Sequence, residues 1–164
     1  MLNIKNAWMI LLDLIKNNSF VPSKKTFHQI NEVIAKDEAL YSGTFRNGFI
    51  GIAGTKNYKA PDYEKLDDIF NSEIHEILNM YNDVEKAIRI FLWTTFNQFY
   101  WDGNKRTARL IANGILISEG IGIFNIKTAD IQEFNTLMID FYDSKEADNI
   151  IKFIAEKCIT YTEE

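Results

Sequence analysis

The twelve residues from Gln98 to Arg109, QFYWDGNKRTAR, carry polar and charged side chains at a spacing that suits a phosphate group. The first turn of a helix has unpaired N–H groups and the positive end of the helix dipole, so it attracts anions. Gly103 would allow a ligand to approach closely, and Asn104 tolerates unusual backbone angles. Arg106 and Arg109 are three residues apart and would share one helix face. Together with Lys105, the two arginines predict an anion site.

Two further side chains define what such a site could do. Asp102 supplies a hard oxygen ligand of the kind that Mg²⁺ prefers beside phosphate. Gln98 stands where a reaction would need a base, but an amide has no basic pKa. Each residue also has a structural interpretation: Asp102 as a helix cap, Gly103 as a turn residue and the arginines as a solvated face. Their combination in one short span favours the functional interpretation.

Helices are expected on both sides of this span. From Val84, apolar residues recur at spacings of three and four up to Phe99, as on the buried face of a helix. Asn82 is the expected N-cap, with Glu85 three residues later. A second helix is expected from Gly103 to Ser118 and should end at Gly120 and Gly122. The remaining helices are expected near residues 5–17, 23–38, 62–81, 128–142 and 145–161, the last with Ser144 as its N-cap.

One region departs from helical spacing. The segment 43–61, GTFRNGFIGIAGTKNYKAP, is rich in glycine and in β-branched or aromatic residues. Residues 49–52, a turn over 53–57 and then Tyr58 predict a short β-hairpin, whose edge could accept a partner strand. The alternative is a surface loop with some strand character. The expected fold class is therefore all-α with a short β-hairpin, in one domain over residues 1–164.

The span 98–109 resembles the signature of the Fic/Doc family, His-Pro-Phe-x-[Asp/Glu]-Gly-Asn-[Gly/Lys]-Arg-x-x-Arg. Residues 102–106 and Arg109 match it, while Gln98 stands for the histidine, Phe99 for the proline and Tyr100 for the phenylalanine. The segment 43–61 is similar to the stretch that leads into the family's β-hairpin flap. The resemblance covers most of the chain from about residue 30 to residue 140.

The resemblance implies a mainly helical fold and transfer of AMP from ATP to a hydroxyl of a target protein. Asp102 would hold Mg²⁺, and Arg109 would reach the outer phosphate. The remaining phosphate contacts would come from Gly103, Asn104, Lys105 and Arg106. The flap residues that would pair with an extended target segment are Gly51, Ile52, Ala53, Gly54, Thr55 and Tyr58. Lys105 also occurs in the Doc branch, which phosphorylates its target, but Gly103 and Arg109 favour AMP transfer.

In that family the motif histidine takes the proton of the attacking hydroxyl. A general base contributes about 10²–10⁴ in rate, so Gln98 predicts weak or altered transfer. The alternative is a non-catalytic module that binds a nucleotide or a protein. His28 and His75 lie in amphipathic helical patterns and are not obvious substitutes for the base. No full match to the family's inhibitory pattern, [Ser/Thr]-x-x-x-Glu-[Gly/Asn], occurs, so either a separate antitoxin supplies inhibition or a protein without the base needs none.

Composition narrows the classes of partner and compartment. A net charge of −5 argues against broad binding to nucleic acid, although a local basic cluster can still hold a small anion. The apolar run near the N-terminus is too short to span a bilayer, and Asp13 interrupts it. Cys158 is the only cysteine, which excludes an internal disulfide and fits a reducing cytoplasm.

Overall fold

The computed structural model describes residues 2–163, and helices dominate it. The helices are α1 (Leu2–Lys16), α2 (Lys24–Ile34), α3 (Leu66–Leu78), α4 (Asp83–Asn97), α5 (Asn104–Ser118), α6 (Ile131–Ser144) and α7 (Asp148–Phe153). Short 3₁₀ turns at Tyr63–Lys65 and Thr128–Asp130 precede α3 and α6, and a π-helical turn at Ile154–Cys158 follows α7. The strands are β1 (Gly122–Phe124) and β2 (Ile159–Tyr161). The predicted mainly helical fold is confirmed.

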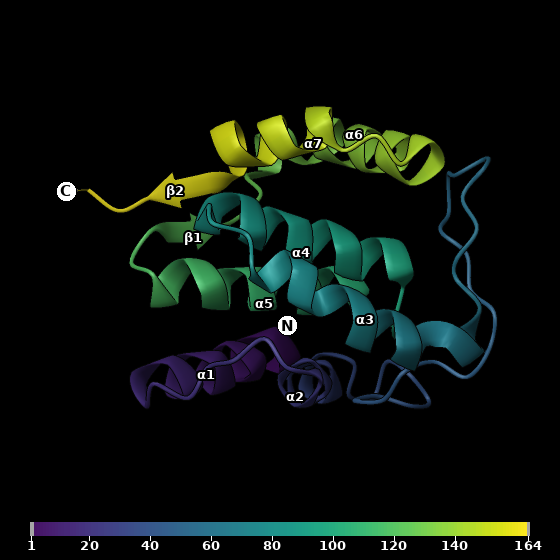
Figure 1. Ribbon diagram of the computed structural model, residues 1–164, viewed down its shortest axis with the longest axis horizontal. Coiled ribbons are helices and arrows are strands. Elements are labelled where there is room, and N and C mark those ends of the chain that lie inside the picture. Colours follow the sequence, from purple (N-terminus) through teal and green to yellow (C-terminus); the bar gives the residue numbers. More distant parts are fainter. Residues whose placement is uncertain (1, 164) are drawn as a thin grey trace.

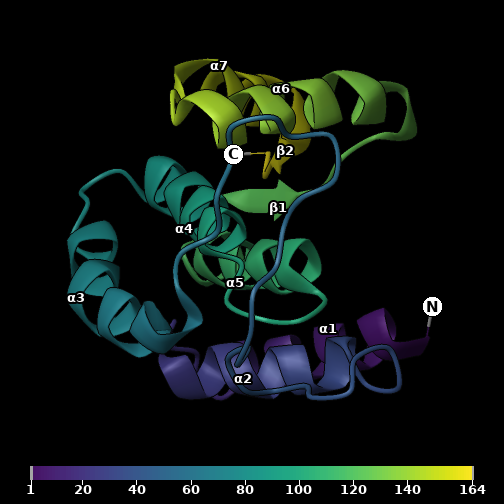
Figure 2. The same cartoon turned by 90° about the vertical axis from the view of Figure 1, so that its right-hand side faces the viewer.

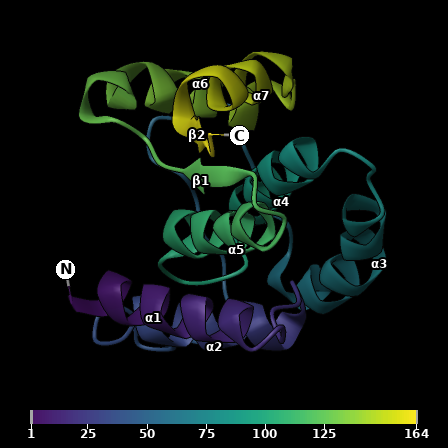
Figure 3. The ribbon, with the colours of Figure 1, turned by 90° about the vertical axis from the view of Figure 1, so that its left-hand side faces the viewer.

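The helices form three layers, with α4 and α5 in the middle. Helices α1 and α2 cover one side of this pair, and α6 and α7 cover the other (Figure 1). Helix α3 flanks α4, and the small sheet lies between α5 and the α6–α7 layer (Figure 3). One continuous apolar core runs through the layers. The central pair is therefore the support on which the loop between α4 and α5 rests.

The predicted start of α4 and the predicted end of α5 near Gly120 are confirmed, whereas Gly122, also expected to end that helix, is the first residue of β1. The side chain of Asn82 caps α4 by accepting a hydrogen bond from the N–H of Glu85 at 2.9 Å. Helix α5 ends at Ser118, and Gly120 follows it in the left-handed region with φ of 67°. Both signals are local, because a cap and a left-handed glycine act within one turn of the helix end.

The predicted last helix, 145–161, is wrong in its start and its end. Ser144 closes α6 instead of capping a new helix, and its hydroxyl accepts from the N–H of Glu146 at 3.0 Å. The final residues leave the helix because Ile159–Tyr161 pairs antiparallel with β1, with Phe124 opposite Ile159. Pairing with a distant strand satisfies the backbone groups that a longer helix would have used.

The sheet lies elsewhere than predicted. Residues 43–61, which we call the flap, contain no strand and form a long two-armed loop that reaches from α2 towards α6 (Figure 2). A turn closes it where the hydroxyl of Thr55 donates to the carbonyl of Ile52 at 2.7 Å. Contacts with the helices replace the expected ladder: the Tyr58 hydroxyl donates to the carbonyl of Phe96 at 2.5 Å. The shape of a hairpin is thus present without hairpin pairing.

No described helix combines the length and the apolar composition needed to cross a membrane.

A buried amide joins α5 to the small sheet. Asn113 has no exposed surface; its Nδ2 donates to the carbonyl of Phe124 at 3.0 Å, and its Oδ1 accepts from the N–H of Phe124 at 2.8 Å. These two bonds copy the exchange that a neighbouring strand would make with β1. Asn113 therefore takes the place of a third strand.

Replacing Asn113 with alanine should lower the free energy of unfolding by about 2–3 kcal/mol, because both polar groups of Phe124 lose their partner in the interior. Chemical denaturation monitored by circular dichroism measures this change. The matched control is Asn135→Ala, at an exposed site in α6, which should change stability by less than about 0.5 kcal/mol. Equal effects of the two substitutions would contradict the assigned role of Asn113.

Candidate functional site

The loop between α4 and α5 begins and ends with left-handed residues. Gln98 follows α4 with φ of 46° and ψ of 57°, and its N–H donates to the carbonyl of Thr94 at 3.2 Å. Gly103 precedes α5 with φ of 75°. A Cβ on Gly103 would lie 2.8 Å from the Ile34 side chain, so glycine is required by both conformation and space. The two left-handed residues turn the chain sharply within the six-residue loop 98–103.

Asn104 closes this loop on itself. Its Oδ1 accepts from the N–H of Tyr100 at 2.9 Å, and its Nδ2 donates to the carbonyl of Tyr100 at 2.8 Å and to Oε1 of Gln98 at 3.2 Å. Only 6% of the residue is exposed. The sequence predicted that Asn104 would offer its amide to a ligand, whereas the structure has both of its amide atoms bound within the loop.

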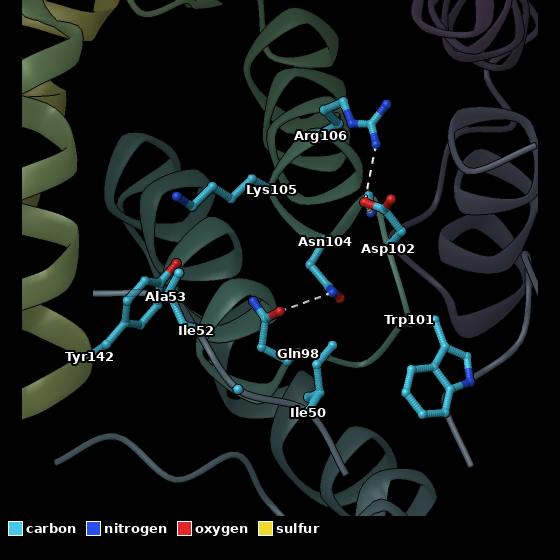
Figure 4. A pocket seen from close by; sticks show the side chains of 12 residues that line it. Ile50, Ile52, Ala53, Gln98, Trp101, Asp102, Asn104, Lys105, Arg106 and Tyr142 are labelled. Carbon is cyan, nitrogen blue, oxygen red and sulfur yellow. Dashed lines mark hydrogen bonds and ion pairs between the residues drawn. The ribbon is translucent and has the colours of Figure 1, made fainter. Parts of the chain in front are cut away.

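Gln98 is equally engaged. Its Nε2 donates to the carbonyl of Thr95 at 2.7 Å while its Oε1 accepts from Asn104, as the dashed line in Figure 4 marks. The carbonyl of Thr95 can only accept, which sets the orientation of the amide. The side chain is 8% exposed and still contributes to the wall of the adjacent cavity.

A buried arginine that the sequence analysis did not single out holds the loop to the flap. Arg46 is 2% exposed; its guanidinium donates to the carbonyls of Gln98 at 2.6 Å, Gly48 at 2.7 Å and Pro61 at 2.6 Å. Its own N–H donates to the carbonyl of Phe99 at 2.8 Å. Burial lowers the pKa of Arg46, but a guanidinium stays charged at neutral pH. The available signal in the sequence was an arginine within the glycine- and phenylalanine-rich stretch 43–49.

A cavity of about 360 Å³ opens beside the loop (Figure 4). The flap forms one wall, the motif loop and the start of α5 form another, and Tyr142 of α6 lines one end. The lining residues are Ile50, Gly51, Ile52, Ala53, Gln98, Trp101, Asp102, Gly103, Asn104, Lys105, Arg106 and Tyr142. Three predicted flap residues, Gly51, Ile52 and Ala53, thus face the motif, whereas Gly54, Thr55 and Tyr58 do not line this cavity.

Acidic and basic groups pair at the Asp102 end of the cavity. Arg106 contacts Glu38 at 2.5 Å and Asp102 at 3.2 Å. The hydrogen bond from Arg106 lowers the pKa of Glu38, and the same bond raises the pKa of Arg106. Glu38 lies 68 residues before its partner, so no local pattern could have predicted this pair.

Lys105 differs from Arg106, because no carboxylate in residues 2–163 lies within ion-pair distance of its amine. Partial burial lowers its pKa through loss of water. Its side chain extends towards the end of the cavity where Tyr142 lies (Figure 4). Lys105 is therefore the cation of this cavity that is available to a ligand.

Arg109 does not line the motif cavity. It lies on a second cavity of about 230 Å³, which Lys105 and Arg106 also line and which Phe91 and Phe134 make largely apolar. Burial lowers the pKa of Arg109 as well. The two arginines predicted to share one anion therefore meet, together with Lys105, on this second cavity, whereas the motif cavity is lined by Lys105 and Arg106 without Arg109.

A metal ion at this site would depend on Asp102 and a ligand together. Its Oδ1 accepts from the N–H of Gly103 and from Arg106, and none of the hydrogen bonds among residues 2–163 uses Oδ2. The described residues contain no group of three or more acidic, cysteine or histidine side chains arranged to hold a metal. Mg²⁺ usually takes one or two carboxylates plus phosphate oxygens and water, so the single free oxygen of Asp102 fits that mode.

The tip of the flap is fixed to α6 by one carboxylate. Oδ1 of Asp143 accepts from the N–H groups of Lys56 at 2.9 Å, Asn57 at 2.8 Å and Tyr58 at 3.0 Å. These bonds lower the pKa of Asp143. Between the tip and Arg46, the N–H groups of residues 49–54 donate to no described acceptor. The flap is thus fastened at both ends and has an unpaired backbone in between.

Three solved structures share this arrangement of helices. The first is a Fic domain containing signaling protein from Bacteroides thetaiotaomicron, with a TM-score of 0.77 and a sequence identity of 13%. The second is Fic-1 (residues 134–508) from C. elegans, with a TM-score of 0.73 and an identity of 15%. The third is the BepC protein of Bartonella tribocorum, with a TM-score of 0.63 and an identity of 10%. The chain has the Fic fold. No protein-family model matches the sequence, and neither does any curated protein.

The Fic fold accounts for nearly all of this chain but not for all of its structural neighbours. The matches cover 93%, 94% and 98% of this chain, and 64%, 46% and 88% of the Bacteroides, C. elegans and Bartonella chains. The chain therefore spans less than two thirds of the first two neighbours. At these identities the likeness establishes the fold, and the chemistry must be argued from the site.

Replacing Arg46 with lysine should lower the free energy of unfolding by about 2–4 kcal/mol, because an ammonium cannot bond three carbonyls that a planar fork reaches together. Thermal and urea denaturation measure the loss. Arg89→Lys is the matched control, since Arg89 pairs with Glu85 on a partly exposed helix face and should change little. A stable Arg46→Lys protein would show that the guanidinium does not hold the loop.

Replacing Asp143 with asparagine should speed amide exchange at residues 56–58, because a neutral amide oxygen accepts hydrogen bonds more weakly than a carboxylate. Hydrogen–deuterium exchange at pH 7 measures the change, and Asp140→Asn on the same helix is the control. The lowered pKa means that the wild-type tip contacts persist at neutral pH and are lost as the pH falls through the folded-state pKa, below the ordinary value of 3.8. Unchanged exchange in Asp143→Asn would contradict the tether.

Proposed function

We propose that this Fic-fold protein binds the phosphate tail of a nucleotide, with ATP as the donor, in the cavity beside the motif loop. Any transfer of AMP to a target hydroxyl would then be weak. The observation that carries the proposal is Lys105, an accessible cation without a described acidic partner, at the start of a helix that opens onto the cavity.

The start of α5 supports anion binding in two ways. The first three N–H groups of a helix have no partner within the helix, and no side chain caps α5. Gly103 lacks a side chain that would cover them, and the helix dipole adds partial positive charge. One of the structural neighbours, the BepC protein, was solved with bound AMPPNP, an analogue of the same chemical class.

The state of Gln98 argues for weak turnover. A hydroxyl attacking phosphorus must lose its proton, and the Gln98 amide cannot accept it. Losing a positioned base costs about 3–5 kcal/mol of transition-state stabilisation. Orientation and charge stabilisation would remain as the sources of rate. We therefore assign Gln98 to the wall of the site and to the loop, not to proton transfer.

Asp102 would hold Mg²⁺ through its free oxygen. The ion would neutralise charge on the phosphate oxygens. Arg106, which pairs with Asp102 and Glu38, would keep that carboxylate oriented while the ligand supplies the remaining oxygens.

The flap is the proposed contact for a target protein. Its residues 49–54 have unpaired N–H groups, and Gly51, Ile52 and Ala53 line the cavity. An extended segment could add to this edge by main-chain hydrogen bonds, as in strand addition. A serine, threonine or tyrosine on that segment would then lie beside the bound nucleotide.

A non-catalytic binding module is the second candidate, and one observation favours it. Both amide atoms of Gln98 are bound within the loop. To orient a substrate, Gln98 would have to break one of these bonds or use its second N–H. Phosphorylation in the manner of the Doc branch would suffer from the same missing base.

Binding is tested by isothermal titration calorimetry with ADP and ATP, with and without Mg²⁺. We expect Lys105→Ala to weaken binding by about tenfold or more, since a charge-assisted contact is lost. Lys86→Ala, on α4 and paired with Asp83, is the control and should bind normally. Absence of nucleotide binding by the wild type would refute the proposed function.

Turnover is tested on the same proteins with labelled ATP, Mg²⁺ and cell lysate. Restoring a base by Gln98→His should increase labelling of protein by about 10²-fold or more. If neither form labels any protein while both bind ATP, the non-catalytic module is the correct function.

A further inference from the structure

Tyr142 carries a buried hydroxyl that nothing in the proposed function uses. The residue is 1% exposed, and its hydroxyl is the one buried side-chain polar atom in residues 2–163 without a hydrogen-bond partner. Tyr142 lines the motif cavity from α6, and its hydroxyl lies at the cavity wall on the side that faces Lys105 and Gln98 (Figure 4). Buried polar groups without partners are rare because they cost free energy, so this one needs an explanation.

Packing does not explain the hydroxyl. The ring of Tyr142 packs against Tyr58 and Phe141, at centroid distances of 5.5 and 5.6 Å, and a phenylalanine ring would fill the same space. The side chain of Thr95 interacts with the Tyr142 hydroxyl and lowers its pKa against the larger effect of burial, but this contact falls outside hydrogen-bond geometry and leaves the hydroxyl without a partner.

The chemistry of the hydroxyl identifies its partner. Burial raises the pKa of Tyr142 to about 12, so the group keeps its proton at neutral pH and can donate a hydrogen bond. Lys105 offers donors and no acceptor, and its side chain extends to the same end of the cavity (Figure 4). Two donors, one of them positively charged, are complementary to an anionic oxygen.

Charge at the other end of the cavity leads to the same conclusion. The carboxylates of Glu38 and Asp102 face one guanidinium, that of Arg106, so two negative charges and one positive charge leave a net charge of −1 there. A bare anion would be repelled from that end and attracted to Lys105 at the other.

We propose that Tyr142 and Lys105 form an anion subsite at the α6 end of the cavity, which takes a phosphate oxygen of the bound nucleotide. The inference rests on the proposed function and specifies it: the hydroxyl of Tyr142 donates to a phosphate oxygen that Lys105 neutralises. Tyr142 is a binding residue in this scheme and takes no part in proton transfer.

The test combines two measurements on Tyr142→Phe, with ADP and inorganic pyrophosphate as probes. Removing a hydroxyl that has no partner should leave the melting temperature unchanged or raise it. The same substitution should weaken binding of both probes by about tenfold or more. Lys105→Met should weaken binding in parallel.

Two other tyrosines supply the controls. Tyr58→Phe removes a hydroxyl with an internal partner and should lower the melting temperature. Tyr161→Phe, whose hydroxyl donates to Ala155 at the exposed end of the chain, should leave affinity for both probes unchanged.

The outcomes separate this subsite from the proposed function. If the wild type binds ADP and Tyr142→Phe binds it equally well, the subsite is refuted and nucleotide binding stands. If Tyr142→Phe loses stability as Tyr58→Phe does, the hydroxyl has an internal partner and the subsite is refuted. If pyrophosphate binds through Tyr142 but nucleotides do not bind, the subsite stands and the nucleotide proposal fails. If neither probe binds to the wild type, both are refuted.

Discussion

The guanidinium of Arg46 is the constraint on which the site depends. A charged group 2% exposed and without a carboxylate partner is tolerated because three carbonyl oxygens surround it. Those carbonyls belong to the end of α4 and to both arms of the flap. One side chain therefore sets the distance between the motif loop and the flap, and the cavity is the space that this distance leaves open.

The motif loop satisfies its own polar groups once it is held in this way. Gln98 and Asn104 bind each other and the local backbone, so two residues that the motif pattern associates with ligand contacts instead maintain the shape of the loop. The cavity is left with the groups that the loop does not use: the N–H groups at the start of α5, the amine of Lys105 and the hydroxyl of Tyr142. These groups can donate to an anion, although the cavity also holds the carboxylate of Asp102, whose Oδ2 none of the described hydrogen bonds uses.

The flap combines restraint at its ends with an unused backbone in its middle. Arg46 holds its base and Asp143 holds its tip, so its position relative to the motif does not depend on a β-ladder. A pre-positioned edge loses less conformational entropy when a partner segment binds to it than a free loop would.

The sequence by itself determined the features that act over a few residues. Hydrophobic spacing located the central helices, and Asn82 and Gly120 marked the start of one and the end of the other. The glycine and charges of residues 102–109 predicted an anion site at the loop. The tertiary structure decided everything that joins distant segments. Pairing of Ile159–Tyr161 with β1 shortened the last helix, and tethering by Arg46 and Asp143 took the place of the hairpin ladder. Glu38 reached Arg106 across 68 residues, and Tyr142 reached the motif from α6. These contacts depend on how the helices pack, because a backbone group bonds to whichever partner the packing brings within reach. The spacing of residues along the chain does not encode that packing.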